Sequence, residues 1–117
     1  MPLDVKVYLH DILRACDAIS EFVEGKMFED YQHSLLLRSG VERQLAIVGE
    51  ALNQALKLEP ELKNRVTSTR QIIDFRNVLV HAYMSVSAPV VWNVIENHLP
   101  LLRREINALL IEFENSD

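Results

Sequence analysis

The sequence predicts an all-α fold: an up-down bundle of four to five helices in a single domain that spans residues 1–117. Glycine occurs only 3 times in 117 residues, and long stretches consist of Leu, Ala, Glu and Arg, which favour helices. Apolar residues recur at spacings of three and four, the period of a helix with one buried face. Hydrophobic residues make up 49% of the chain, so this domain can form a core without a disulfide or a structural metal.

The first helix is expected over residues 4–24. Asp4 precedes it and can cap its first turn, and Gly25 follows it as a helix terminator. The apolar positions alternate spacings of three and four, so they form one stripe. This predicted buried stripe consists of Val5, Tyr8, Ile12, Ala15, Ile19 and Phe22.

The next helical pattern covers residues 28–58, and Pro60 closes it. Gly40 interrupts this pattern at a cost of about 1 kcal/mol relative to Ala. Residues 61–69 are polar and lack a long period, which predicts a connection with one helical turn. The stripe of the long helix is clearest at Leu37, Val41, Leu45, Val48, Leu52 and Ala55.

A third helix is expected to begin after Ser68, which stands three residues before Gln71 in the spacing of a capping box. It runs into the stretch RNVLVHAYMSVSAP, whose serines and proline predict a break. Ser87 and Pro89 suit the start of a fourth helix. That helix should bend near Pro100, and its first part, around Trp92, should pack in the core.

The charge distribution argues against a protein that coats nucleic acid. The net charge is −5, but residues 31–83 carry 7 basic and 5 acidic side chains. We therefore expect an anionic ligand to bind in this segment. The lone Cys16 cannot form an internal disulfide, which favours a reduced, cytoplasmic setting. No apolar run approaches the roughly 20 residues of a membrane span, and the N-terminal residues do not resemble a signal peptide. We therefore expect a cytoplasmic protein without a membrane partner.

Arg76, His81 and Tyr83 form the feature that goes beyond a generic bundle. They lie in the stretch R-NVLV-H-A-Y at the end of the third predicted helix. In a regular helix Tyr83 is nearly in phase with Arg76, whereas His81 lies about 140° away. A guanidinium can hold a phosphate through two parallel hydrogen bonds, and an imidazole can move protons at neutral pH. This combination suits phosphodiester chemistry without a metal.

With this motif, the sequence resembles the HepT-like toxins of the HEPN superfamily, whose signature is Arg, four to six residues, His, any residue and Tyr. The resemblance continues outside the motif and covers nearly the whole chain. The matching segments are YLHDIL, IVGEAL, FRN and VWNVIENHLPLL, in the same order.

The resemblance implies a HEPN-like homodimer that acts as a metal-independent endoribonuclease on tRNA or mRNA, with no cofactor and no metal. Arg76 would bind the scissile phosphate and stabilise its extra negative charge in the transition state. His81 would act as general base or acid, on the ribose 2′-OH or the leaving 5′-oxygen. Asn77 would supply a supporting hydrogen bond.

The resemblance also implies a partner, a minimal nucleotidyltransferase antitoxin of the MntA type. In such type VII toxin–antitoxin systems the enzyme transfers AMP units from ATP to the motif tyrosine, which is Tyr83 here. A bulky adenylate beside Arg76 and His81 would exclude substrate RNA.

Two other functions stay open at this point. The chain could be a catalytically silent HEPN subunit that binds nucleotide beside a nucleotidyltransferase, or a helical scaffold without chemistry. Cleavage of RNA would distinguish the ribonuclease toxin from the silent subunit. A metal site is not expected, because the remaining histidines are scattered over separate helices; they are His10, His33 and His98.

Overall fold

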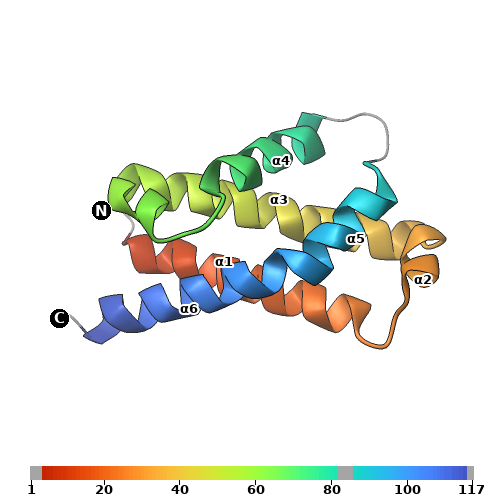
Figure 1. The fold of residues 1–117 in the computed structure, drawn as a ribbon, viewed down its shortest axis with the longest axis horizontal. Coiled ribbons are helices and arrows are strands. Elements are labelled where there is room, and N and C mark those ends of the chain that lie inside the picture. Colours follow the sequence, from red (N-terminus) through yellow and green to blue (C-terminus); the bar gives the residue numbers. More distant parts are fainter. Residues whose placement is uncertain (1–3, 82–85, 116–117) are drawn as a thin grey trace.

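The computed structural model describes residues 4–81 and 86–115, and this part of the chain consists of helices joined by loops, without a strand (Figure 1). The predicted all-α class is confirmed. Two breaks that the sequence pattern did not separate raise the number of α-helices in the described part to six, with one 3-10 helix between two of them. The elements are α1 (Val5–Val23), α2 (Phe28–Gln32), α3 (Leu35–Leu58), η1 (Pro60–Asn64), α4 (Thr69–His81), α5 (Ala88–Asn97) and α6 (Leu99–Asn115).

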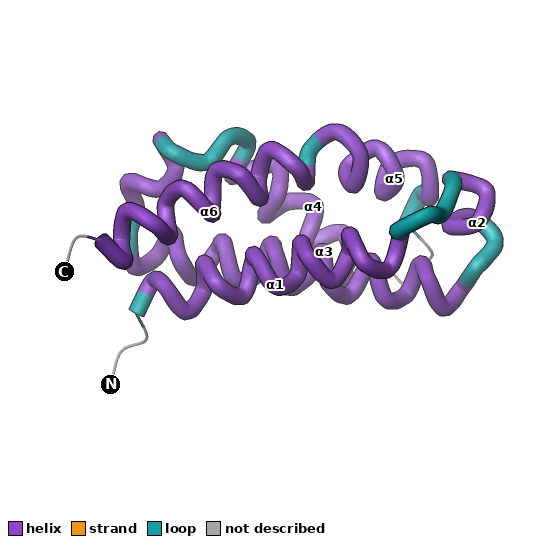
Figure 2. The backbone as a smooth tube through the Cα atoms, turned by 90° about the horizontal axis from the view of Figure 1, so that it is seen from below, coloured by secondary structure: helices purple, strands orange, loops and turns teal. Residues whose placement is uncertain are grey.

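The long helix α3 occupies the middle of the bundle. It packs against α1 on one side and α4 on another, and α6 also packs against α1. Successive long elements run in opposite directions along the long axis, as an up-down bundle requires (Figures 1 and 2). The short helix α2 contacts both α3 and α5 at one end of the bundle. The main helix contact of α4 is with α3, and α4 lies toward the outside of the bundle (Figure 1).

Helix α1 forms as its sequence predicts. The Asp4 carboxylate accepts a hydrogen bond of 2.9 Å from the backbone N–H of Lys6, and Gly25 follows the helix with a φ of +72°. The buried face includes Leu9 and Cys16, which the predicted stripe did not contain. Phe22, expected in the core, is 38% exposed, because its ring lies against the helix surface at Gly40 near the end of the bundle.

The expectation of one helix over residues 28–58 is wrong. The chain breaks at His33 and Ser34, which separates α2 from α3. Ser34 adopts extended backbone angles, and its hydroxyl accepts a hydrogen bond of 3.0 Å from the N–H of Leu37. Ser34 is therefore the N-cap of α3, and satisfying the free amides of a new helix favours the break.

The connection from α3 to α4 follows the prediction closely. Pro60 ends α3 and opens η1, the single expected turn. Ser68 directly precedes α4, but its φ of +62° lies in the left-handed region, whereas an N-cap residue usually has extended angles. The predicted start of the helix is correct, although its cap departs from the regular geometry.

The expected bent fourth helix is divided into α5 and α6, which meet at His98, two residues before Pro100. Trp92 on α5 is half-buried and packs against two rings of α2. The ring centroids lie 5.6 Å from Tyr31 and 6.2 Å from Phe28, the distances of favourable aromatic pairs. These contacts fix α2 to the bundle. No helix in the described ranges has the length and apolarity needed to cross a membrane.

Candidate functional site

Helix α4 carries the Arg76–His81 pair on an element that is covered on one side only. None of its residues is fully buried, although Ile72, Phe75 and Leu79 are half-buried against α3. Val78 and Val80 remain 53% and 50% exposed. The side of α4 that faces away from α3 is therefore open to a ligand or another chain.

Arg76 lies at a point where α4 approaches α3 tightly. A Cβ built on Gly49 would lie 2.3 Å from the Cβ of Arg76, 2.9 Å from its Cγ and 3.3 Å from the carbonyl oxygen of Ile72. Only a residue without a side chain fits between the two helices here. Gly49 thus brings the Arg76 backbone and the first carbons of its side chain directly onto α3.

The Arg76 guanidinium is bound at both terminal nitrogens. Its Nη2 forms an ion pair with Oε2 of Glu50 at 2.6 Å, and its Nη1 donates to Oδ1 of Asn77 at 2.8 Å. Gln54, one turn further along α3, donates to the other carboxylate oxygen of Glu50 at 3.1 Å. The side chains of Arg76 and Glu50 are 27% and 43% exposed, so solvent still reaches the pair.

His81 is exposed at the last residue of α4. It follows Arg76 by five residues in a continuous helix, so the two side chains leave the helix about 140° apart. Within one chain, Arg76 is held toward α3 while His81 faces the open side. The third motif residue, Tyr83, lies outside the described residues.

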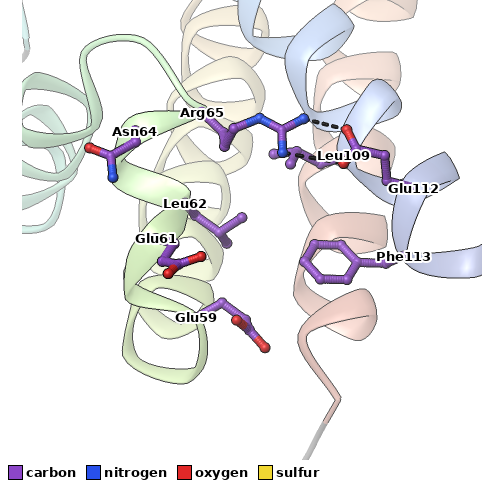
Figure 3. Close-up of a pocket in the computed structure, with 8 residues that line it drawn as sticks. All are labelled: Glu59, Glu61, Leu62, Asn64, Arg65, Leu109, Glu112 and Phe113. Atoms are coloured by element: carbon purple, nitrogen blue, oxygen red, sulfur yellow. Dashed lines mark hydrogen bonds and ion pairs between the residues drawn. The ribbon is translucent and has the colours of Figure 1, made fainter. Parts of the chain in front are cut away.

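The cavity of about 580 Å³ shown in Figure 3 lies elsewhere, between η1 and the end of α6. Three glutamates line it, and one of them, Glu112, is paired with Arg65, whose guanidinium is therefore already neutralised. The other lining residues are the polar Asn64 and the apolar Leu62, Leu109 and Phe113. This acidic cavity is poorly suited to a phosphate, and neither Arg76 nor His81 lines it.

The other reactive side chains, Cys16 and His10, are buried or contact another side chain, and neither lies near Arg76 in the sequence. Cys16 is 1% exposed, and burial raises the pKa of its thiol to about 12, which makes it a poor nucleophile. His10 contacts Glu114 of α6 at 3.1 Å. In residues 4–81 and 86–115, no group of three or more His, Cys, Asp or Glu side chains is placed to hold a metal ion.

Glu50 and Gly49 are the site residues that sequence reasoning missed. Both lie in the segment IVGEAL, which was informative only as part of the family resemblance. A Gly-Glu pair inside a helical pattern gives no sign of its partner, since Arg76 follows 26 residues later on another helix. A single signal was available: a glycine inside a helix usually has a packing reason.

Comparison with known proteins agrees with the motif. The model of the family described as "Ribonuclease HepT-like" matches residues 12–109. A Thermococcus cleftensis protein named "Probable ribonuclease HepT" is 32% identical over 89% of this chain and 94% of its own length. A Caldanaerobacter subterraneus protein named "Putative RNase" is 31% identical over 88% of this chain and 91% of its own length.

A longer relative from Methanocaldococcus jannaschii carries the name "Gamma-glutamylcyclotransferase and putative RNase". It is 29% identical over 99% of this chain, which spans only 52% of that relative's length. No solved structure matches the chain. Because the family model covers most of the sequence and two relatives exceed 30% identity over most of it, the chain belongs to the HepT-like ribonuclease family.

Proposed function

We propose that this chain is the toxin of a type VII toxin–antitoxin system, a metal-independent endoribonuclease that cuts tRNA or mRNA in the cytoplasm. The observation that carries the proposal is that Arg76 is held by two partners while His81, on the same helix, is exposed. The Arg76 guanidinium forms an ion pair with Glu50 and donates a hydrogen bond to Asn77. Its helix, α4, ends at the exposed His81. Membership of the HepT-like ribonuclease family and the names of its relatives support RNA as the substrate.

The proposed reaction is transesterification at one phosphodiester. An imidazole removes the proton of the ribose 2′-OH, the 2′-oxygen attacks phosphorus, and the bond from phosphorus to the 5′-oxygen breaks. A protonated imidazole returns a proton to the leaving 5′-oxygen. Arg76 binds the phosphate and stabilises the additional negative charge of the transition state. Because the nucleophile is the 2′-OH, DNA is not a substrate.

The site is proposed to lie between two copies of the chain. In one chain Arg76 faces α3 and His81 faces the open side of α4, so the pair does not converge on one side of the helix. A twofold axis beside α4 would bring the exposed His81 of one copy toward the partly exposed Arg76 of the other. The half-exposed Val78 and Val80 would then be covered, which favours association.

Regulation is proposed to act at Tyr83. A cognate nucleotidyltransferase of the MntA type would adenylylate its hydroxyl, two residues after His81. The added phosphate and adenine would occupy the space that RNA needs, and the phosphate is an anion of the kind that Arg76 binds.

The test is cleavage of RNA by the purified, unmodified protein in excess EDTA. Wild type is compared with His81→Ala and with His10→Ala, which also removes an exposed imidazole, but from α1. We expect wild type and His10→Ala to cleave in the chelator, and His81→Ala to be inactive while retaining its helical circular dichroism. Equal cleavage by all three proteins would mean that the activity is a contaminant or lies elsewhere. No cleavage by folded wild type would favour the silent nucleotide-binding subunit.

A further inference from the structure

Glu50 is part of a chain of contacts that ends at the Arg76 guanidinium. Gln54 donates to Oε1 of Glu50 at 3.1 Å, and Oε2 of the same carboxylate receives Nη2 of Arg76 at 2.6 Å. Both carboxylate oxygens are therefore occupied by partners of fixed position. Gln54, on the same helix α3, orients the carboxylate of Glu50, and this carboxylate in turn orients Arg76 on α4.

The Arg76 guanidinium has five N–H bonds, and two of its three nitrogens have a partner in the structure. Nη2 forms an ion pair with Glu50 at 2.6 Å, and Nη1 donates one hydrogen to Asn77. Nε is closed to solvent and has no hydrogen-bond partner among the described residues. Nη1 and Nη2 together carry four hydrogens, so N–H groups beyond the one donated to Asn77 remain for a two-point contact to a phosphate.

The rest of the Arg76 side chain cannot easily take another position. Its Cβ and Cγ lie against Gly49, where even a methyl group would approach within 3 Å. The freedom that remains is rotation of the outer carbons, which would swing the guanidinium away from α3. The ion pair with Glu50 opposes this rotation, because leaving it would give up the attraction between two charges in contact at 2.6 Å, which solvent screens only in part.

We propose that Glu50 is a positioning residue for the phosphate-binding arginine of this site. It keeps Arg76 in the orientation in which the remaining N–H groups of its terminal nitrogens are free for an incoming phosphate, and it stays paired while the phosphate binds. This inference rests on the proposed function, in which Arg76 stabilises the transition state. Glu50 touches neither the RNA nor the reacting atoms.

The test combines kinetics with a direct measurement on Arg76. The variants are Glu50→Ala, Glu50→Gln and, as a matched control, Glu42→Ala, which removes another partly exposed carboxylate of α3. In Glu50→Ala we expect kcat for RNA cleavage to fall about tenfold or more, with KM changed much less, since a loosened arginine chiefly weakens transition-state binding. Glu50→Gln, which keeps an oxygen acceptor, should recover part of the loss, and Glu42→Ala should cleave like wild type.

NMR of the Arg76 Nε–H group gives a readout that needs no RNase activity. The wild-type signal should be sharp and exchange slowly with water, and it should broaden or exchange quickly in Glu50→Ala but not in Glu42→Ala. An unchanged Arg76 signal in Glu50→Ala would overturn the positioning role. A kcat equal to or above that of wild type, or tighter RNA binding, would also overturn it, because Glu50 would then be idle or compete with the phosphate. If wild type itself cleaves no RNA, the proposed function fails, and the NMR comparison still decides whether Glu50 positions Arg76.

Discussion

Replacing Gly49 by Ala introduces one methyl group where α3 and α4 lie in close contact. That methyl would lie 2.3 Å from the Cβ of Arg76, whereas ordinary contacts begin near 3.4 Å, so α4 must retreat by roughly 1 Å. The obstacle is the first carbon of the Arg76 side chain, which moves only with its backbone. The substitution therefore displaces the helix that carries both proposed catalytic residues.

The expected stability change is a balance of two effects. Ala in place of Gly inside a helix contributes up to about 1 kcal/mol, while overpacking a close helix contact costs about 1–3 kcal/mol. Gly49→Ala should therefore be neutral to about 2 kcal/mol less stable. Gly40→Ala is the matched control on the same helix. There the new Cβ would lie 3.3 Å from Cε2 of Phe22, whose partly exposed ring can move aside, so this variant should gain stability.

Activity should separate the two variants more strongly than stability does. A displacement of about 1 Å at a reacting group can lower a rate by about 100-fold, and we expect a loss of this order in RNA cleavage by Gly49→Ala. Gly40→Ala should cleave like wild type. Urea unfolding followed by circular dichroism gives the stability, and cleavage of RNA in EDTA gives the activity. A Gly49→Ala protein that is more stable than wild type and fully active would refute the close packing of α4 on α3.

Three further predictions follow from the surroundings of single residues. Burial raises the pKa of Glu42 in the folded protein, and Arg38 only partly offsets this, so the charged carboxylate costs stability at neutral pH. Glu42→Gln should raise the free energy of unfolding at pH 7. The gain should vanish below about pH 4, because there the wild-type carboxyl is protonated in both the folded and the unfolded state. Urea unfolding at the two pH values checks this. Cys16, with its pKa raised to about 12 by burial, should react with a thiol reagent at pH 8 only as fast as the protein unfolds, and rapid labelling of folded protein would contradict its burial. Co-expression with the proposed cognate nucleotidyltransferase of the MntA type should add AMP to wild type but not to Tyr83→Phe, as mass spectrometry would show, and modification of both proteins would exclude Tyr83 as the acceptor.

The sequence predicted those parts of the fold that depend on local signals. Asp4 and Gly25 bound α1, and Pro60 ends α3, because capping and backbone restrictions act within a few residues. Ser34 carried the same kind of signal, an N-cap residue just before a run of leucines. It was missed because the helical period of the apolar residues continues across the break.

Features that depend on contacts between helices could not be predicted. Neither the tight fit of Gly49 on Arg76 nor the ion pair of Arg76 with Glu50 follows from spacing, since α3 and α4 meet only in the folded bundle. The motif identified α4 as the candidate functional helix. What the structure adds is the direction of Arg76, toward α3 and away from the side of His81.

The central claim is that Arg76 of one copy and His81 of another form the RNA-cleaving site. The most direct test mixes Arg76→Ala with His81→Ala, each inactive alone, under conditions in which subunits exchange. In a mixed dimer one of the two shared sites has both residues, so random pairing should restore about a quarter of wild-type RNA cleavage. No recovery, with mass spectrometry confirming mixed dimers, would contradict a site shared between chains, and a protein that stays monomeric at micromolar concentration would contradict it as well.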